Sequence, residues 1–215
     1  RRFSGGLIRG GHISVDGFVG GVATEAAVRE EMAREDESDE VNFMIRRLRI
    51  TLKGHAFTDD LTYKVQLGWD KGESPALKDA VVDYRVIDGV LHVRAGQYKK
   101  PFNRQQITSS GKLELADRSI TDKTYHAGRD IGLTVHNDYE KSPTVEYGVG
   151  VYNGSGDELV FTAPGDGSNV PAFFDPLLVA RLGYNFGKLK GYSEVDFEGG
   201  EPRFGVAANA QTRLN

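Results

Sequence analysis

The feature that most constrains this chain is a period-two alternation of apolar and charged residues over residues 42–53. Side chains of a β-strand point alternately to its two faces, so such a pattern predicts a strand between two unlike environments. The apolar set is Met44, Leu48, Ile50 and Leu52, and the opposing set is Arg47, Arg49, Thr51 and Lys53. One wall of this strand is apolar and the other is cationic.

The same alternation recurs along the chain and predicts about ten strands, with no long helix. Because the strands follow one another without intervening helical patterns, the predicted fold class is all-β. The predicted strands are 12–19, 42–53, 61–70, 77–86, 90–100, 129–138, 144–153, 177–186, 191–198 and 203–212.

Composition narrows the classes of protein to consider. The 215 residues contain 27 glycines, 7 prolines and no cysteine, and no linker divides them, which favours one domain without disulfides or thiolate chemistry. No run reaches the roughly 18 apolar residues of a membrane helix. Membrane β-barrels escape that criterion, because half of each strand faces a polar lumen. The isoelectric point near 5.8 argues against a nucleic-acid partner.

The predicted connections alternate between long and short. Long loops at one end of a sheet and short turns at the other are typical of an antiparallel up-and-down barrel that crosses a membrane. The long connections are 20–41, 101–128 and 154–176, the intermediate one is 71–76, and the short ones are 54–60, 87–89, 139–143 and 187–190.

Five ordered segments carry a resemblance to a known family. The chain resembles the phosphate-selective porin O and P family in the stretches 43–54 (FMIRRLRITLKG), 77–84 (LKDAVVDY), 93–104 (VRAGQYKKPFNR), 128–132 (GRDIG) and 151–154 (VYNG). The resemblance implies a bacterial outer-membrane barrel of about sixteen strands. It also implies a homotrimer in outer-membrane lipid that passes small hydrophilic solutes or anions without a cofactor. Since fewer strands are predicted here, residues 1–215 are expected to form one incomplete barrel domain, its N-terminal part.

If the apolar face meets lipid, the polar face lines a water-filled pore. The predicted pore-lining cations are Arg47, Arg49, Lys53, Lys64, Arg85, Arg94 and Lys100, set against Asp70, Asp79 and Asp83. Later strands instead offer Asp130, Glu146, Glu194, Asp196 and Glu198 against Arg181 and Arg203. Opposed walls of unlike charge predict a field across the pore, so the chain is a poorer match to a dedicated phosphate channel than the family resemblance suggests. The clustered cations are consistent with a channel for small solutes that prefers anions or phosphate. The alternative for each cation is a solvated position or a neighbouring carboxylate partner.

Two long loops are assigned separate roles. Residues 101–128 are the candidate constriction loop, because Pro101 ends a strand and the resemblance implies a third loop that folds into the barrel. Its candidate anion-interacting residues are Arg104, Lys112, Arg118 and Lys123. The alternative is an exposed loop of mixed charge. Residues 20–41 form an acidic loop, interpreted as a solvated segment, with a divalent-cation bridge to lipid headgroups as the alternative.

Other classes of protein remain as alternatives. The five histidines show no metal-ligand spacing. The enzyme alternative is a serine hydrolase built into the barrel, which would require His92 or His136 to meet a strand serine across the sheet. No nucleotide-binding glycine motif is present. The chain is therefore interpreted as a channel and not as an enzyme. A scaffold barrel that holds partner proteins and conducts little is the main alternative, and a soluble all-β binding module is the other.

Overall fold

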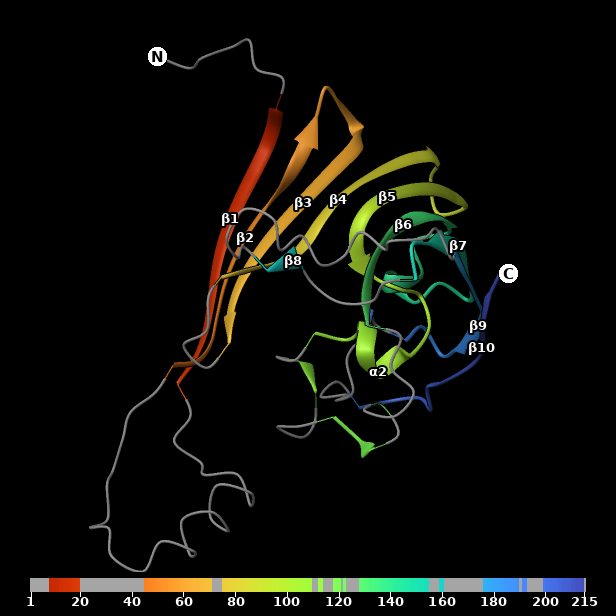
Figure 1. Cartoon of the computed structure of the whole chain (residues 1–215). Helices are drawn as coiled ribbons and strands as arrows, with labels where there is room; N and C mark the ends of the chain where they lie inside the picture. The colour runs from red at the N-terminus through yellow and green to blue at the C-terminus, as the bar shows by residue number, and fades with distance from the viewer. Residues whose placement is uncertain are drawn as a thin grey trace, which may run out of the picture.

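In the computed structural model the strands form one antiparallel sheet (Figure 1). The structure describes residues 8–19, 45–70, 75–109, 112–113, 118–120, 122, 128–154, 159–160, 176–189, 191–192 and 199–214. The strands are β1 (Ile8–Val19), β2 (Ile45–Ala56), β3 (Thr58–Asp70), β4 (Ala76–Ile87), β5 (Leu91–Lys99), β6 (Arg129–His136), β7 (Val145–Tyr152), β8 (Leu159–Val160), β9 (Leu177–Phe186) and β10 (Phe204–Arg213). The short helices are α2 (Arg104–Ile107) and the 3-10 turn η2 (Tyr139–Lys141).

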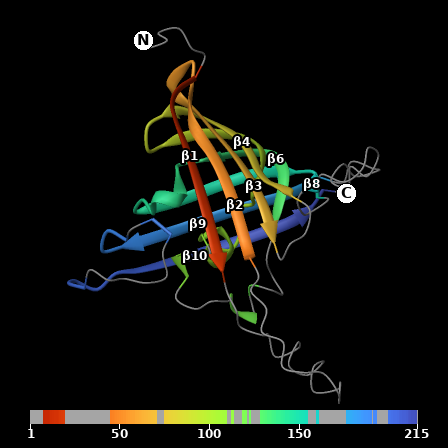
Figure 2. The ribbon, with the colours of Figure 1, turned by 90° about the vertical axis from the view of Figure 1, so that its left-hand side faces the viewer.

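Strand order follows chain order almost throughout. Each strand from β1 to β7 pairs with the next, β7 pairs with β9, and β9 pairs with β10, whereas the two-residue β8 pairs with β4. The sheet curls into an open trough, with β1 and β2 facing β9 and β10 across its width (Figures 1 and 2). Within the described residues β1 and β10 are its two edges, and α2 lies on the concave side.

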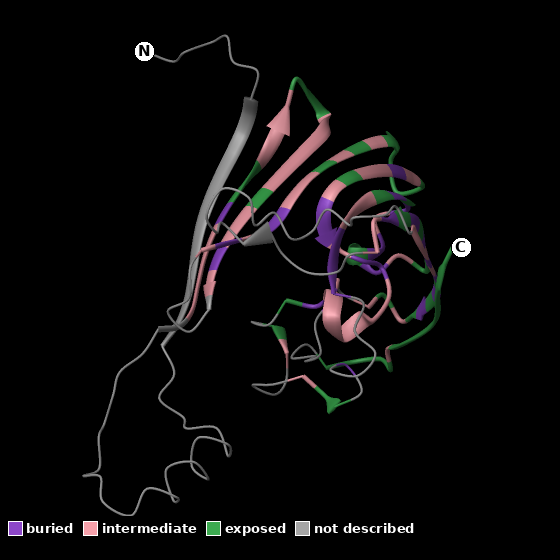
Figure 3. Cartoon of the chain, viewed as in Figure 1, coloured by how far each residue is buried: buried purple, intermediate pink, exposed green. Residues whose placement is uncertain are grey.

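The two faces of the trough are inverted relative to a soluble domain, which buries apolar side chains and exposes charged ones. Alternation of burial along the strands is visible in Figure 3. Exposed residues on the convex face include Val82, Tyr84, Leu133, Val135, Val149, Val151, Leu182 and Tyr184. Buried polar residues facing the concave side include Thr51, Asp79, His92, Thr134, His136, Glu146, Arg181 and Asn185. Among the described residues no helix is long and apolar enough to cross a membrane.

A small aromatic core fills the concave face between β5 and β9. Tyr98, Tyr152 and Val179 are buried together, and the rings of the two tyrosines meet edge to face with centroids 5.8 Å apart. The Tyr98 hydroxyl donates to Thr134 Oγ1 at 2.7 Å, so its polar end is satisfied. The Tyr152 ring lies against the backbone of Gly132, where any Cβ would collide with it. The charged side chains of the concave face lie around this core.

The all-β, antiparallel up-and-down fold predicted from the sequence is confirmed. The predicted strand 177–186 has the same bounds as β9, and most others differ from the structure by one to three residues. The predicted turn 54–60 is shorter than expected: β2 and β3 are joined by Phe57 alone, whose φ of 63° reverses the chain.

The prediction that residues 191–198 form a strand of the sheet between 177–186 and 203–212 is wrong. β9 pairs directly with β10, from Phe186 opposite Phe204 to Leu177 opposite Arg213, which leaves no place between them. Gly191 and Tyr192 lie outside any strand, and residues 193–198 fall outside the described residues. The alternation there was misleading because Tyr192 is buried on the concave side, where it contacts Glu146.

The inverted faces predict opposite responses at two neighbouring residues of β2. Leu52 is on the apolar face and Lys53 on the polar face. We expect Leu52→Arg to impair folding into lipid, because an arginine in the lipid-facing band costs about 2–4 kcal/mol. Lys53→Leu is expected to leave folding nearly unchanged. Denaturant titration of protein refolded into vesicles measures both, and equal losses would mean that the assigned facing is incorrect.

Candidate pore-lining surface

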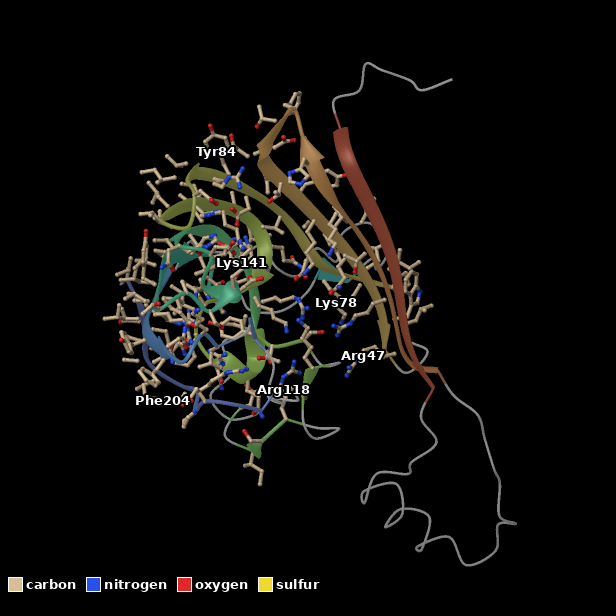
Figure 4. All side chains as sticks on the ribbon, turned by 180° about the vertical axis from the view of Figure 1, so that it is seen from behind. Arg47, Lys78, Tyr84, Arg118, Lys141 and Phe204 are labelled. Carbon is tan, nitrogen blue, oxygen red and sulfur yellow. The ribbon has the colours of Figure 1, made fainter. Side chains whose placement is uncertain are left out.

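A cavity of about 640 Å³ occupies the concave face. Its walls come from β2 to β6, from the segment after α2 and from η2, and most of its lining is charged or polar. Figure 4 shows Arg47, Lys78 and Arg118 on the concave side of the sheet, whereas Tyr84 and Phe204 lie on its outer side. Three groups of ion pairs organise the concave face.

Asp79 of β4 is the centre of the first group. Its Oδ2 lies 2.5 Å from Lys64 Nζ of β3, and its Oδ1 accepts a hydrogen bond from Arg129 Nε of β6 at 2.9 Å. Asp79 and Arg129 are buried, whereas the Lys64 side chain is 42% exposed. Two cations share one carboxylate, so the group retains a positive charge where Lys64 reaches the cavity.

Asp83, four residues further along β4, is the centre of the second group. It accepts from Arg94 Nε at 2.7 Å and from His136 Nε2 at 2.9 Å, and His92 Nδ1 lies 3.1 Å from its other oxygen. Arg94 Nη1 also pairs with Glu140 of η2 at 2.5 Å. The Arg94 charge is therefore shared between two carboxylates.

The two histidines of this group have structural roles. The backbone N–H of Asp138 donates to His136 Nδ1 at 2.9 Å, so Nδ1 is an acceptor and Nε2 carries the proton donated to Asp83. The rings of His92 and His136 stack with centroids 5.3 Å apart. Among the described residues neither imidazole is hydrogen-bonded to a serine, and no cluster of three His, Asp or Glu residues suits a metal ion. These contacts give no support to the serine hydrolase alternative.

Glu146 of β7 is the centre of the third group. The carboxylate is buried, and Arg181 of β9 donates to its Oε2 from Nε at 3.1 Å and from Nη2 at 2.8 Å. Asn185 Nδ2 donates to Oε1 at 2.6 Å, and Arg104 Nη1 lies 3.4 Å from the same oxygen. The Tyr192 hydroxyl donates to Oε2 at 3.0 Å, and burial raises its pKa above the ordinary value, so it remains a donor.

Two further cations hold the segment 101–109, named here the inner segment. Lys99 Nζ donates to the carbonyl groups of residues 106–108 at 2.5–3.3 Å, and Arg118 donates to the carbonyls of Gln105 and Thr108 at 3.1 and 3.0 Å. These carbonyls lie at the C-terminal end of α2, where backbone acceptors lack helical partners and cations are favourable. The inner segment is thus held on the concave face by side chains.

Charge around the cavity is separated along the strands. At the end where Phe57 and the turns 88–90 and 137–144 connect strands, the lining acids are Asp59, Asp60, Asp138 and Glu140, accompanied by Arg85 and Lys141. At the opposite end, the lining cations are Arg49, Lys99, Lys112 and Arg129, accompanied by Asp79. Lys53 and Lys64, directly opposite each other on β2 and β3, lie between them.

The predicted opposition of a cationic wall and an acidic wall stays a prediction, because Glu194, Asp196 and Glu198 lie outside the described residues. Asp130 and Glu146, expected to make the later strands acidic, are paired with Lys100 and with Arg181 and Arg104. Among the described residues that line the cavity, the charge separation runs along the strands.

The structure places the predicted site residues in unlike surroundings. Arg49, Lys53, Lys64, Arg85, Arg94 and Lys112 line the cavity. Lys100 is buried against Asp130, with 3.4 Å between Nζ and Oδ2. Arg104 and Arg118 contact protein groups, Arg47 is half-buried in β2, and Lys123 lies outside the described residues. Their role in anion passage stays a prediction.

Sequence reasoning missed Lys99 and Arg129, which line the cavity. Strict alternation from Arg94 placed Lys100 and not Lys99 on the pore face. Gly96, inside β5, has a φ of 122°, and the residues after it, Gln97 and Tyr98, are both buried. A glycine within a strand often marks an irregularity, so Gly96 was the available signal.

A curved antiparallel sheet with an apolar convex face and a charged concave face is the wall of a membrane β-barrel. The family model of phosphate-selective porin O and P matches residues 26–197, and the chain belongs to this family. Its members are outer-membrane porins, so the family implies a channel and not an enzyme. No curated protein and no solved structure matches the chain.

The Asp83 group predicts a stability role for Arg94. Arg94→Met keeps the length of the side chain but leaves Asp83 and Glu140 without the cation. Removing one partner of a buried ion pair costs about 3–5 kcal/mol. We expect a lower denaturation midpoint in vesicles for Arg94→Met than for Lys53→Met, which removes an exposed cation. Equal midpoints for the two variants would contradict a structural role for Arg94.

Proposed function

We propose that this chain forms part of the wall of a water-filled outer-membrane channel that passes small anions, phosphate among them, in preference to cations. The observation that carries the proposal is the inverted sheet, whose concave face holds a cavity of about 640 Å³ with cations along one end and the middle. Such a surface replaces the water around an anion with fixed charges, whereas the convex face suits lipid.

Two kinds of cation contribute differently to anion passage. Lys53, Lys64 and Lys112 bring ammonium groups to the cavity, and these are point charges on flexible stems. Arg49 and Arg129 bring planar guanidinium groups, whose paired N–H donors match the oxygen atoms of phosphate. Because Asp79 lies between Lys64 and Arg129, it offsets part of their charge and limits how tightly an anion is held, which favours passage over retention.

The axial separation of charge gives the channel a direction. In barrels of this type short turns face the periplasm and longer loops face outward. With that orientation, an anion from outside meets the end carrying Arg49 and Lys112 first and the acidic end last. We therefore expect the current to depend on the sign of the applied voltage.

The remaining features of the barrel follow from the same proposal. Unpaired backbone groups are costly in lipid, so the edges β1 and β10 require further strands to complete the wall. Residues 101–128 act as the constriction loop, of which the inner segment is the part already on the concave face. Residues 20–41 lie outside the described residues, and the acidic outer loop predicted for them stays part of the proposal, as does assembly of the complete barrel into a homotrimer.

Planar-bilayer conductance of the full-length protein tests the function. In a potassium chloride gradient we expect steady steps, an anion-biased reversal potential and unequal currents at opposite voltages. Phosphate titrated into chloride should lower the chloride current. Conduction with a cation-biased reversal potential would contradict the anion preference. The absence of any current despite verified insertion would favour the scaffold alternative.

Charge reversal at two exposed cavity residues tests the selectivity. Lys53 and Lys112 are exposed and line the cavity, so Lys53→Glu and Lys112→Glu change the charge of the pore at residues outside the three ion-pair groups. We expect each variant to lower the anion-to-cation permeability ratio, with a larger effect at low salt because screening is weaker. Lys188→Glu is the matched control, since Lys188 is exposed in the turn after β9. Identical reversal potentials in all three variants would remove Lys53 and Lys112 from the conduction path.

A further inference from the structure

The carboxylate of Glu146 holds together parts of the chain that are distant in sequence. Four residues donate to it: Arg104 from the inner segment, Arg181 and Asn185 from β9, and Tyr192 from the loop between β9 and β10. Glu146, Arg181 and Tyr192 are all buried. The group therefore joins one loop that follows β5 and another that follows β9 to the centre of the sheet.

Arg181 extends these connections to the backbone of the inner segment. Its Nη1 donates to the Phe102 carbonyl at 3.3 Å and to Asn209 Oδ1 of β10 at 2.8 Å. On the other side, Arg104 Nη2 donates to Ser142 Oγ at 3.3 Å, beside η2. The inner segment is thus fixed to the wall of the trough at Phe102 and at Arg104.

The Tyr192 ring fixes the Arg104 guanidinium from a second direction. The guanidinium carbon lies 4.4 Å from the ring centroid, a distance at which the π face attracts a cation. The Tyr192 hydroxyl donates to the same Glu146 carboxylate that Arg104 approaches. Arg104 is therefore held between an aromatic face and a buried carboxylate, and its charge is used within the protein.

We propose that Glu146 is the positioning residue of the channel: through Arg104 and Arg181 it locks the inner segment against the concave face and so sets the width of the pore. Arg104, expected from the sequence to contact anions, acts as the movable half of this lock. Loss of either half weakens the hold on the inner segment, to which Lys99 and Arg118 also contribute. The link to pore width depends on the proposed channel function, whereas the lock itself does not.

The lock is testable by thiol labelling, because the chain has no cysteine. Thr108 is buried at the end of the inner segment, so Thr108→Cys places a single, shielded thiol there. In the full-length protein in vesicles, we expect Glu146→Gln and Arg104→Met each to speed labelling of that thiol by a charged reagent by about tenfold or more. Combining the two substitutions should add little, because both break the same contact.

Asp130→Asn is the matched control. Asp130 is also buried, faces the same trough and accepts from Lys100 and from the backbone of Ile131 and Gly154. The Asp130→Asn variant loses the same charge as Glu146→Gln, and we expect labelling of the thiol at position 108 to remain slow in it. Unchanged labelling in Glu146→Gln and Arg104→Met would overturn the lock, and so would equal acceleration in Asp130→Asn. Because Arg104→Met alters no strand, it decides the matter even where Glu146→Gln folds poorly.

Single-channel recording then tests the effect on pore width. We expect Glu146→Gln and Arg104→Met to show frequent changes of current level where the parent protein shows one steady level. Faster labelling with an unchanged current level and noise would overturn the role in pore width. A parent protein that does not conduct would instead overturn the channel function, and the labelling result would still decide the lock.

Discussion

Neutralisation of charge within a single face is the constraint on which the rest of this structure depends. The convex face is apolar, so the ionised side chains of the sheet gather on the concave face and must find partners there. Asp79, Asp83 and Glu146 each take donors from at least two other elements. A buried ion is tolerated only where pairing and hydrogen bonds compensate its desolvation. The three carboxylates therefore fix the relative positions of strands and loops as well as the charge of the surface.

This constraint divides the cations into two classes. Arg104, Arg118 and Lys99 donate to carboxylate or backbone oxygens of the protein and stabilise the inner segment. Lys53 and Lys112 are exposed at the cavity. A count of cations on the polar face consequently overestimates the charge that a solute meets, and the division between the classes is set by which residues a carboxylate can reach.

Strand alternation made the fold and the facing predictable, because a period of two is the direct expression of a sheet with unlike faces. The details that failed depend on tertiary context. At Gly96 a positive φ breaks the alternation, so Lys99 and not Lys100 lines the cavity. At Tyr192 a residue in a strand-like pattern packs instead on the concave face beneath Arg104. The partners of Glu146 lie from 35 to 46 residues away in sequence, with Arg181 at 35 and Tyr192 at 46, so no local pattern reveals them.

The direction of charge separation was the other feature that the sequence could not supply. Assigning charges strand by strand suggests walls of opposite sign, since the early strands are rich in cations and the later ones in acids. Antiparallel pairing also brings alternate strand ends to one level, so Asp59 beside the Phe57 turn and Glu140 in η2 meet at the same end of the cavity. Arg49 and Arg129, in strands far apart in sequence, meet at the other. An axial field follows from topology, and it acts on an ion along its path.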